Sequence, residues 1–281
     1  MMALCDGTEV AGDKQARLEA ILRDLGRAAV AYSGGVDSTY LLAIAVDTLG
    51  HDNVLALTVA SELIPAREVT LAQEMASRLG VKHQILSLQA LAVPAIVANP
   101  PDRCYFCKLE VLQRIATVAA AQGFPLLIHG ANRDDQHDYR PGTRAAAELG
   151  ARAPLDESGL TKTEIRDLSR RRGLPTWDHP SQACLASRVP YHTPLTAETL
   201  RRIQAAEEYL RDHLGVQALR VRDHFPVARI EVLPDDWPAL LAGDARTGLL
   251  AEFRRLGYRY VALDLAGLRS GSMNDLLGER V

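Results

Sequence analysis

The sequence lacks the features that mark membrane, exported and nucleic-acid-binding proteins. None of its apolar runs approaches the ~20 residues that a membrane helix needs, and residues 1–15 contain no apolar segment after a basic start. A formal net charge of −3 gives no general attraction to nucleic acid. Internal repeats and low-complexity tracts are also absent. These absences predict a cytoplasmic protein without a membrane partner, and they disfavour a nucleic-acid partner.

Cysteine is scarce as well. The chain has four cysteines, too few and too unevenly spaced for a disulfide framework: Cys5, Cys104, Cys107 and Cys184. We treat the first as incidental; the second and third lie one helical turn apart. Three interpretations stay open: buried cysteines without chemistry, a zinc site completed by a histidine such as His179 or His192, or three thiolates of an iron–sulfur cluster with one iron left open.

Two glycines join an apolar run to a helix-forming run. Residues 30–32 suit a buried parallel strand, and Gly34 and Gly35 allow positive φ and a close approach to a ligand. Asp37 and Ser38 open a helix, whose first-turn amides and positive dipole end bind anions. An ordinary glycine turn is the competing interpretation. We expect a phosphate-binding loop that lacks the lysine of a Walker loop.

With 47% apolar residues, the 281-residue chain can form one large and one small domain. After a loose leader, the predicted helices span residues 16–25, 65–79, 104–122 and 164–172, and the strands 27–32, 53–60, 81–88 and 125–129. This alternation predicts the α/β class, a doubly wound parallel sheet, whose ligands lie at the carboxyl ends of the strands. That edge carries Ser33, Val59, Ser61 and Gly130, as candidate ligand contacts, and the polar loop 130–142. Thr161 and Glu164 form a capping box, which we interpret as structural only.

Residues 189–194, with two prolines, are the expected linker, giving domains 1–189 and 190–281. The second domain is predicted to be a small α+β module, with helices at 196–213 and 247–256 and strands at 217–222, 227–232 and 258–263. Strand alternation places Arg220 and Arg222 on one face. They form either a plain solvent face or a clamp for a phosphate or carboxylate. As a clamp, Arg222→Lys is expected to weaken substrate use without affecting the fold.

Several motifs together resemble one family. The string Ser33-Gly-Gly-Val-Asp-Ser38 resembles the pyrophosphate loop of the ATP pyrophosphatases. Together with six further segments, this string resembles the ATP-dependent sulfur transferases of the LarE family. The further segments are Cys104-Tyr-Phe-Cys-Lys108, the loop 130–142, residues 160–166, Cys184-Leu-Ala-Ser-Arg188, Arg220 with Arg222, and residues 269–274. The resemblance spans roughly residues 18–274. The resemblance implies the doubly wound α/β fold of the ATP pyrophosphatases, followed by a small α+β domain.

The resemblance also implies a reaction. ATP would be held by its β and γ phosphates and split to AMP and pyrophosphate, with Asp37 helping to hold Mg²⁺. A carboxylate of pyridinium-3,5-biscarboxylic acid mononucleotide would be adenylated and converted to a thiocarboxylate, a step toward the nickel-pincer cofactor of lactate racemase. Sulfide or another donor would supply sulfur, and the family suggests a homo-oligomer. The matching residues are Cys184 as the sulfur-bearing cysteine, Glu231 as an active-site acid, and Arg220, Arg222, Ser187, Arg188 and Asp134 as substrate or phosphate contacts.

The cysteines depart from the single-cysteine members of the family, which sacrifice the sulfur of one residue. The addition of Cys104 and Cys107 resembles the subgroup with a 4Fe-4S cluster, whose three ligands would include Cys184. Sacrifice of Cys184 without a cluster stays open. So do an ammonia-dependent amidating synthetase, a tRNA thiolase and a non-catalytic metal-binding module.

Overall fold

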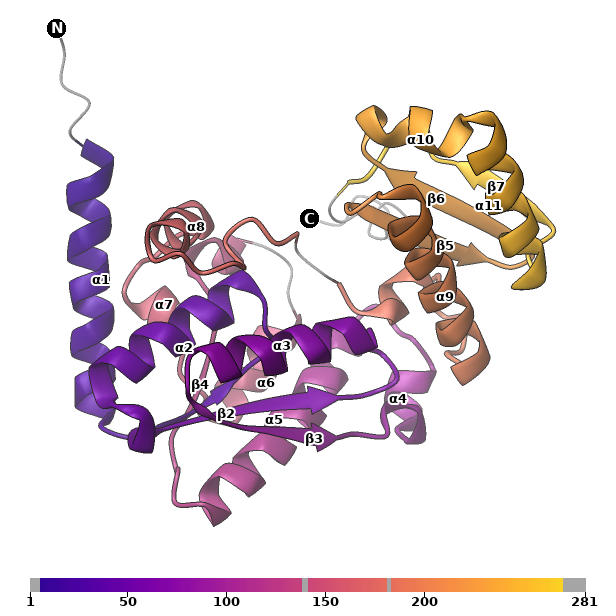
Figure 1. The fold of residues 1–281 in the computed structure, drawn as a ribbon. Helices are drawn as coiled ribbons and strands as arrows, with labels where there is room; N and C mark the ends of the chain where they lie inside the picture. The colour runs from indigo at the N-terminus through magenta and orange to yellow at the C-terminus, as the bar shows by residue number, and fades with distance from the viewer. Residues whose placement is uncertain (1–5, 138–140, 181–182, 270–281) are drawn as a thin grey trace, which may run out of the picture. The chain divides into compact units, whose positions relative to one another are not determined.

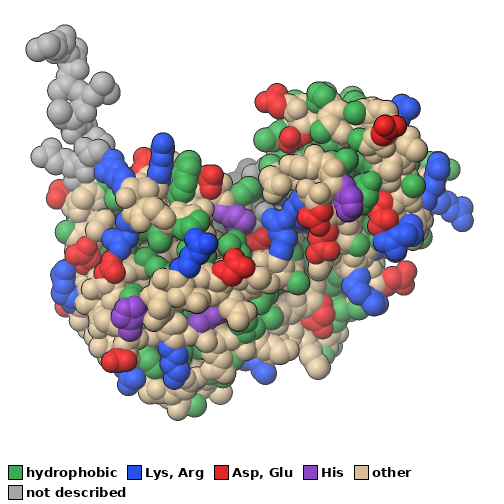
Figure 2. Space-filling view, in the orientation of Figure 1, with side chains coloured by type: hydrophobic (Ala, Val, Ile, Leu, Met, Phe, Trp, Pro, Cys, Tyr) green, Lys and Arg blue, Asp and Glu red, His purple; other side chains and the backbone are tan. Residues whose placement is uncertain are grey.

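The computed structural model describes residues 6–137, 141–180 and 183–269, which group into two compact units. The first unit comprises residues 1–61, 66–88 and 102–181, and the second comprises 62–65, 89–101 and 182–281. Among the described helices, none has the length and apolar character to cross a membrane. Side chains of both charges are interspersed over the face drawn in Figure 2, in keeping with the small net charge.

The first unit is built on a parallel sheet with the order β3-β2-β1-β4. Strands β2 and β3 run side by side in Figure 1. Its strands are β1 (Ala28–Ala31), β2 (Val54–Ala60), β3 (Lys82–Ser87) and β4 (Leu127–His129), all in parallel register. Its helices are α1 (Asp6–Leu25), α2 (Val36–Leu49), α3 (Ala66–Arg78), α5 (Arg103–Ala121), α6 (Pro141–Glu148), α7 (Pro154–Glu157) and α8 (Lys162–Arg171). The predicted α/β fold is therefore confirmed.

Both faces of this sheet are covered, because successive side chains of a strand point to opposite sides. Val30 of β1 and Ala56 of β2 pack into a core shared with helices α1, α2, α3 and α8. Ala29 and Leu57 of the same strands face the other core, which helices α5 and α6 complete. Strands β1, β2 and β4 are buried on both faces and read as continuous apolar runs, which is why the sequence revealed them, whereas the edge strand β3 is mostly exposed.

Two segments differ from the sequence-based expectation. Helix α1 begins at Asp6, so the expected loose leader is helical from that residue onward. The added turns bury Ala11, in addition to Leu18 and Leu22 of the predicted part of the helix. The polar loop 130–142 contains a 3₁₀ turn, η3 (Arg133–His137), and the start of α6 at Pro141. Proline at the start of a helix loses no hydrogen bond there, so the sequence carried a signal for this helix.

The second unit holds a mixed sheet of order β5-β6-β7. Strands β5 (Leu219–His224) and β6 (Val227–Val232) are antiparallel, and β7 (Tyr260–Leu263) pairs with β6 in parallel. Helices α9 (Ala197–Leu214), α10 (Trp237–Leu241) and α11 (Gly243–Arg255) share one apolar core with the sheet, and α4 (Pro94–Val97) also belongs to this unit. Val221 and Ile230 lie in that core, which leaves Arg222 and Glu231 on the opposite face of their strands.

The segment 189–194 is fastened within the second unit. The buried side-chain amide of Asn99 donates to the carbonyl groups of Val189, Pro190 and Thr193, at 3.4, 2.8 and 3.1 Å. His192 in turn donates its backbone N–H to the carbonyl of Asn99. The expected linker thus has hydrogen-bond partners inside one unit, and the division of the chain at residue 189 stays a proposal.

Candidate active site

The phosphate loop joins β1 to α2. Gly34 has a φ of +78°, and a Cβ atom there would lie 2.9 Å from the Cα of Ala72, so this position requires glycine. Gly35 has a φ of −72° and precedes α2 as its N-cap, so positive φ is needed at only one of the two glycines. No described side chain caps α2. Its first-turn amides therefore point into the loop, as an anion site requires.

Hydroxyl groups hold the loop in shape. The Oγ atoms of Ser33 and Ser38 lie 3.0 Å apart, and the Ser38 hydroxyl donates to the carbonyl of Gly35 at 3.1 Å. Gly130, which follows β4, lies against the first turn of α2. A Cβ atom added to Gly130 would be 2.9 Å from the backbone nitrogen of Ser38. These residues and Asp135 line a cavity of about 330 Å³ at the carboxyl edge of the sheet.

The predicted nucleotide contacts at the end of β2 lie at the same edge. Val59 is buried within the strand, and Ser61 follows its last residue. Strands β1 and β2 are parallel neighbours, so their carboxyl ends lie side by side at one edge of the sheet. Val59 and Ser61 therefore lie at the end of the strand that neighbours the phosphate loop.

Asp37, in the first turn of α2, is a half-buried carboxylate whose two oxygen atoms have different surroundings. Oδ2 accepts a hydrogen bond from the ammonium of Lys162 at 2.5 Å. Oδ1 is buried and has no hydrogen-bond partner among the described residues. Burial raises the pKa of Asp37, although Lys162 acts in the opposite direction. A divalent cation bound at Oδ1 would satisfy this oxygen, so Asp37 fits the predicted magnesium ligand.

Asp134 and Asp135 fold the loop after β4 back onto this region. Asp134 accepts a hydrogen bond from the backbone N–H of Lys162 at 2.8 Å, and Asp135 accepts one from the N–H of Asn132 at 3.1 Å. Asp135 also lines the loop cavity. The predicted substrate contact Asp134 therefore positions the start of α8.

A second lysine and a histidine also line the loop cavity. Lys108 reaches it from α5, and His129 from the end of β4. Desolvation lowers the pKa of Lys108. Burial, together with the nearby charge of Lys108, lowers the pKa of His129 to about 4. His129 is therefore a neutral ring at pH 7, and Lys108 brings a side-chain amine into the cavity.

Cys104 and Cys107 lie near the start of α5, three positions apart. Cys104 is exposed and lines the same cavity, while Cys107 is half-buried. The guanidinium of Arg103 approaches the Sγ atom of Cys104 at 4.0 Å. Among the residues that the structure describes, no three His, Cys, Asp or Glu side chains gather into a metal site. His179, one histidine considered for zinc, lies 3.4 Å from Glu68 instead.

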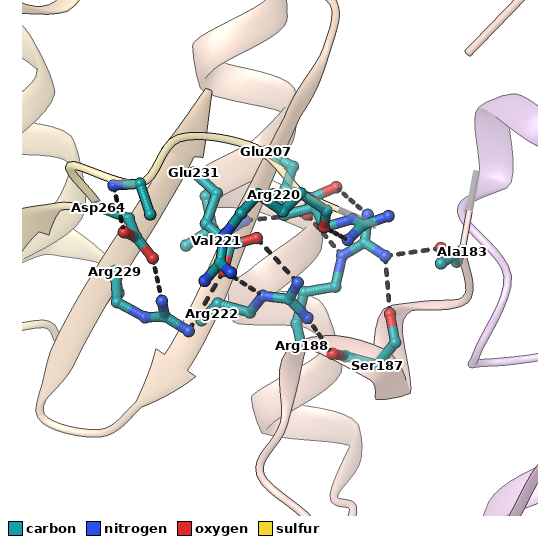
Figure 3. Close-up of polar contacts among 12 residues, drawn as sticks. Ala183, Ser187, Arg188, Glu207, Arg220, Val221, Arg222, Arg229, Glu231 and Asp264 are labelled. Atoms are coloured by element: carbon teal, nitrogen blue, oxygen red, sulfur yellow. Dashed lines mark hydrogen bonds and ion pairs between the residues drawn. The ribbon is translucent and has the colours of Figure 1, made fainter. Parts of the chain in front are cut away.

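Cys184 belongs to the second unit and immediately precedes a 3₁₀ turn, η4 (Leu185–Arg188). Its carbonyl accepts hydrogen bonds from the hydroxyl of Ser187 at 2.8 Å and from the guanidinium of Arg188 at 3.3 Å. Arg188 is fully buried and pairs with Glu207 of α9 at 2.8 Å (Figure 3). Ser187 and Arg188 thus fix the backbone that carries the half-buried thiol of Cys184.

Glu207 connects this turn to the sheet. It accepts hydrogen bonds from Arg188, from Arg211 and from the backbone N–H of Val221. Burial alone would raise the pKa of Glu207, but the charges of the two arginines and these hydrogen bonds outweigh it and lower the pKa. The carboxylate therefore stays ionised inside the unit.

Arg222 does not lie on a solvent face, because its guanidinium is buried and held by Glu231. The two form a bidentate pair at 2.9 and 2.8 Å, with the side chains 1% and 0% exposed. Another nitrogen of Arg222 donates to the carbonyl of Ser187 at 2.5 Å (Figure 3). The expectation that Arg222→Lys would spare the fold does not fit this burial, since the guanidinium fork is part of the interior.

Arg220, two residues earlier, is in a different position. It is half-buried and donates to the carbonyl of Arg269 at 2.8 Å. Desolvation and the neighbouring charges of Arg222 and Arg188 lower the pKa of Arg220. Arg220 is therefore a partly exposed guanidinium beside the buried pair of Arg222 and Glu231, so the two arginines do not act as an equivalent pair.

The comparisons with known proteins agree with this arrangement. Pyridinium-3,5-bisthiocarboxylic acid mononucleotide synthase of Lactiplantibacillus plantarum is 41% identical over 264 residues, covering 94% of this chain and 95% of that protein. The chain belongs to the LarE family. An uncharacterised Synechocystis protein is 42% identical over 94% of this chain and 98% of its own length. As a LarE family member, the chain is an ATP-using enzyme, a sulfurtransferase.

A more distant likeness concerns the nucleotide part of the LarE fold. The sequence profile of the NAD synthase family matches residues 18–98, which include the phosphate loop. An NH₃-dependent NAD⁺ synthetase of Chlorobaculum tepidum is 29% identical over 53% of this chain and 54% of its own length. This likeness therefore covers the loop and the first strands.

Sequence reasoning located the loop and the arginine strand, but it gave no individual role to four residues around them. Lys162 lies within the predicted capping box, which the structure contains in full, yet its ammonium pairs with Asp37 from 125 positions away. Lys108 and His129 gave weak signals, as one lysine next to the cysteine pair and one histidine at a strand end. Glu207 was one of several acids on an amphipathic helix, and nothing in its spacing predicted burial.

Proposed function

We propose that this enzyme adenylates a carboxylate of pyridinium-3,5-biscarboxylic acid mononucleotide with ATP and converts it to a thiocarboxylate. The 41% identity to the Lactiplantibacillus synthase over nearly the whole of both chains carries this proposal. That relative's name states a bisthiocarboxylic acid mononucleotide as product. The uncapped loop at the carboxyl edge of the sheet is consistent with binding a phosphate-rich co-substrate.

The loop would bind the β and γ phosphates of ATP through the amides that open α2. Ser33, Gly35 and Ser38 line its cavity, and Val59 and Ser61 would lie near the adenosine. Asp37, through its buried unpartnered oxygen, would hold Mg²⁺, which neutralises charge on the leaving pyrophosphate. The cations of Lys108 and Lys162 would take the place of the missing Walker lysine.

The second unit would bind the acceptor. Arg220 is the half-buried guanidinium of the arginine strand, so we assign it to the phosphate or carboxylate of the substrate. Arg222 and Glu231 would hold the strand and the turn of Ser187 in position through their buried pair. Arg188 would do the same for the turn of Cys184.

Sulfur transfer would involve the three cysteines. Thiolates are soft ligands that suit iron, and Cys104 and Cys107 share one helix turn with exposed or half-buried sulfurs. We therefore propose that they and Cys184 hold a 4Fe-4S cluster. Such a group would supply sulfur without consuming a cysteine. We further propose a cytoplasmic homo-oligomer that takes sulfide or another sulfur donor, and no nucleic-acid partner.

Anaerobic purification with iron and sulfide analysis tests the cluster, for which we expect about four irons per chain. Incubation with ATP, Mg²⁺, the biscarboxylate and sulfide should yield AMP, pyrophosphate and several thiocarboxylates per chain. ADP and phosphate as products would contradict the loop assignment. If Cys184 instead loses the mass of H₂S, with one product per chain and a harmless Cys104→Ser change, the protein is a sacrificial sulfur donor.

The match to the NAD synthase profile favours a second candidate, an ammonia-dependent amidating synthetase. Such an enzyme would form the same adenylate but would pass the acyl group to ammonia. Replacing Cys104, Cys107 and Cys184 together distinguishes the two functions. The triple variant would keep its turnover with ammonia if it is a synthetase, whereas a sulfurtransferase would lose its product.

A further inference from the structure

The contact between Lys162 and Asp37 joins two segments that are 125 residues apart. The backbone of Lys162 is fixed, because its N–H donates to Asp134 at 2.8 Å and the residue lies within the capping box formed by Thr161 and Glu164. Its side chain is 30% exposed. The four-carbon side chain is therefore anchored at one end and able to redirect its ammonium at the other.

The ammonium lies where a metal ion at Asp37 would meet strong repulsion. It is 2.5 Å from Oδ2 of the carboxylate, while Oδ1 is buried without a hydrogen-bond partner among the described residues. A divalent cation on this carboxylate and an ammonium at its other oxygen would be like charges a few ångströms apart. Asp37 and Lys108 line the cavity that would receive the phosphates.

We propose that Lys162 is the counter-ion of Asp37 in the nucleotide-free site, and that it is exchanged for Mg²⁺ when ATP binds. This inference rests on the proposed function, since ATP must occupy the loop. The metal takes the carboxylate, and the displaced ammonium moves to a phosphate oxygen. Metal without nucleotide would displace the lysine with no phosphate to receive it. Metal and ATP therefore bind with positive linkage, each increasing the affinity for the other.

The test measures Mn²⁺ binding to the full chain by electron paramagnetic resonance, with and without α,β-methylene-ATP, which resists cleavage between the α and β phosphates. Wild-type protein should bind Mn²⁺ weakly alone and at least about tenfold more tightly with the analogue. Lys162→Met should bind Mn²⁺ about tenfold more tightly without nucleotide and the analogue about tenfold more weakly. Lys162→Arg, which keeps the charge, should behave like the wild type.

Two further variants complete the test. Lys82→Met, at an exposed lysine of β3, is the matched control and should change neither the Mn²⁺ affinity nor the analogue affinity. Asp37→Asn should abolish tight Mn²⁺ binding both in the otherwise wild-type protein and in Lys162→Met. Unchanged or weaker Mn²⁺ binding by Lys162→Met, with analogue binding by the wild type intact, overturns the exchange and leaves the proposed function standing. If the wild type binds no analogue, the exchange and the proposed function fail together.

Discussion

Replacing Arg222 by Met should destabilise the second compact unit, because it leaves the carboxylate of Glu231 buried without its bidentate partner. Removing one member of a buried pair costs about 3–5 kcal/mol. Arg229 still approaches Glu231 at 3.2 Å, so we expect a loss near the lower end, about 3 kcal/mol. Arg222→Lys keeps the charge but loses the fork, and should cost less, about 1–2 kcal/mol.

The assay is urea unfolding followed by tryptophan fluorescence. The chain has two tryptophans, and Trp237 packs against the core of the second unit. In a Trp177→Phe background, Trp237 alone reports on that unit. The exposed Arg254 of α11 provides the control, since Arg254→Met should leave the unfolding midpoint unchanged.

The double variant Arg222→Met, Glu231→Met separates a lost ion pair from lost packing. Replacing both members of a buried pair by apolar residues of similar size is often close to neutral, so the double variant should recover most of the stability that the single change removes. Additive losses, or a single-variant loss below about 1 kcal/mol, would refute the claim that Arg222 and Glu231 depend on each other.

Three further predictions concern the first unit. Asp37→Ala should lower the rate of pyrophosphate release by about 10²- to 10³-fold, the scale for losing one electrostatic stabiliser; a rate within threefold or so of wild type would remove Asp37 from the metal site. His129 titrates at about 4 when folded and near 6.5 when unfolded, so the unfolded chain binds more protons between these values and the free energy of unfolding falls as the pH drops from about 6.5 to 4. His129→Gln should reduce that slope in urea titrations, and an identical slope would mean the ring is protonated in the native state. Gly130→Ala should weaken ATP binding, measured by calorimetry, by at least about tenfold, because its Cβ would meet the backbone nitrogen of Ser38 at 2.9 Å; Gly12→Ala, with open space around it, should not.

The sequence alone determined the layered α/β fold and the place of the phosphate loop. Both follow from local patterns: continuous apolar runs mark strands buried on two faces, and a glycine pair before a helix start marks an anion site. The alternation along β5 also placed Arg220 and Arg222 on one face, because side-chain direction in a strand has a period of two residues.

Only the tertiary structure decided how these residues are used. Burial of Arg222 depends on Glu231 of the neighbouring strand β6 and on the turn of Ser187, which lies 35 positions earlier in the chain. Lys162 reaches Asp37 because α8 packs beside α2. No local pattern encodes such pairings, since the free energy of a charged group depends on the partners and the solvent that folding leaves around it.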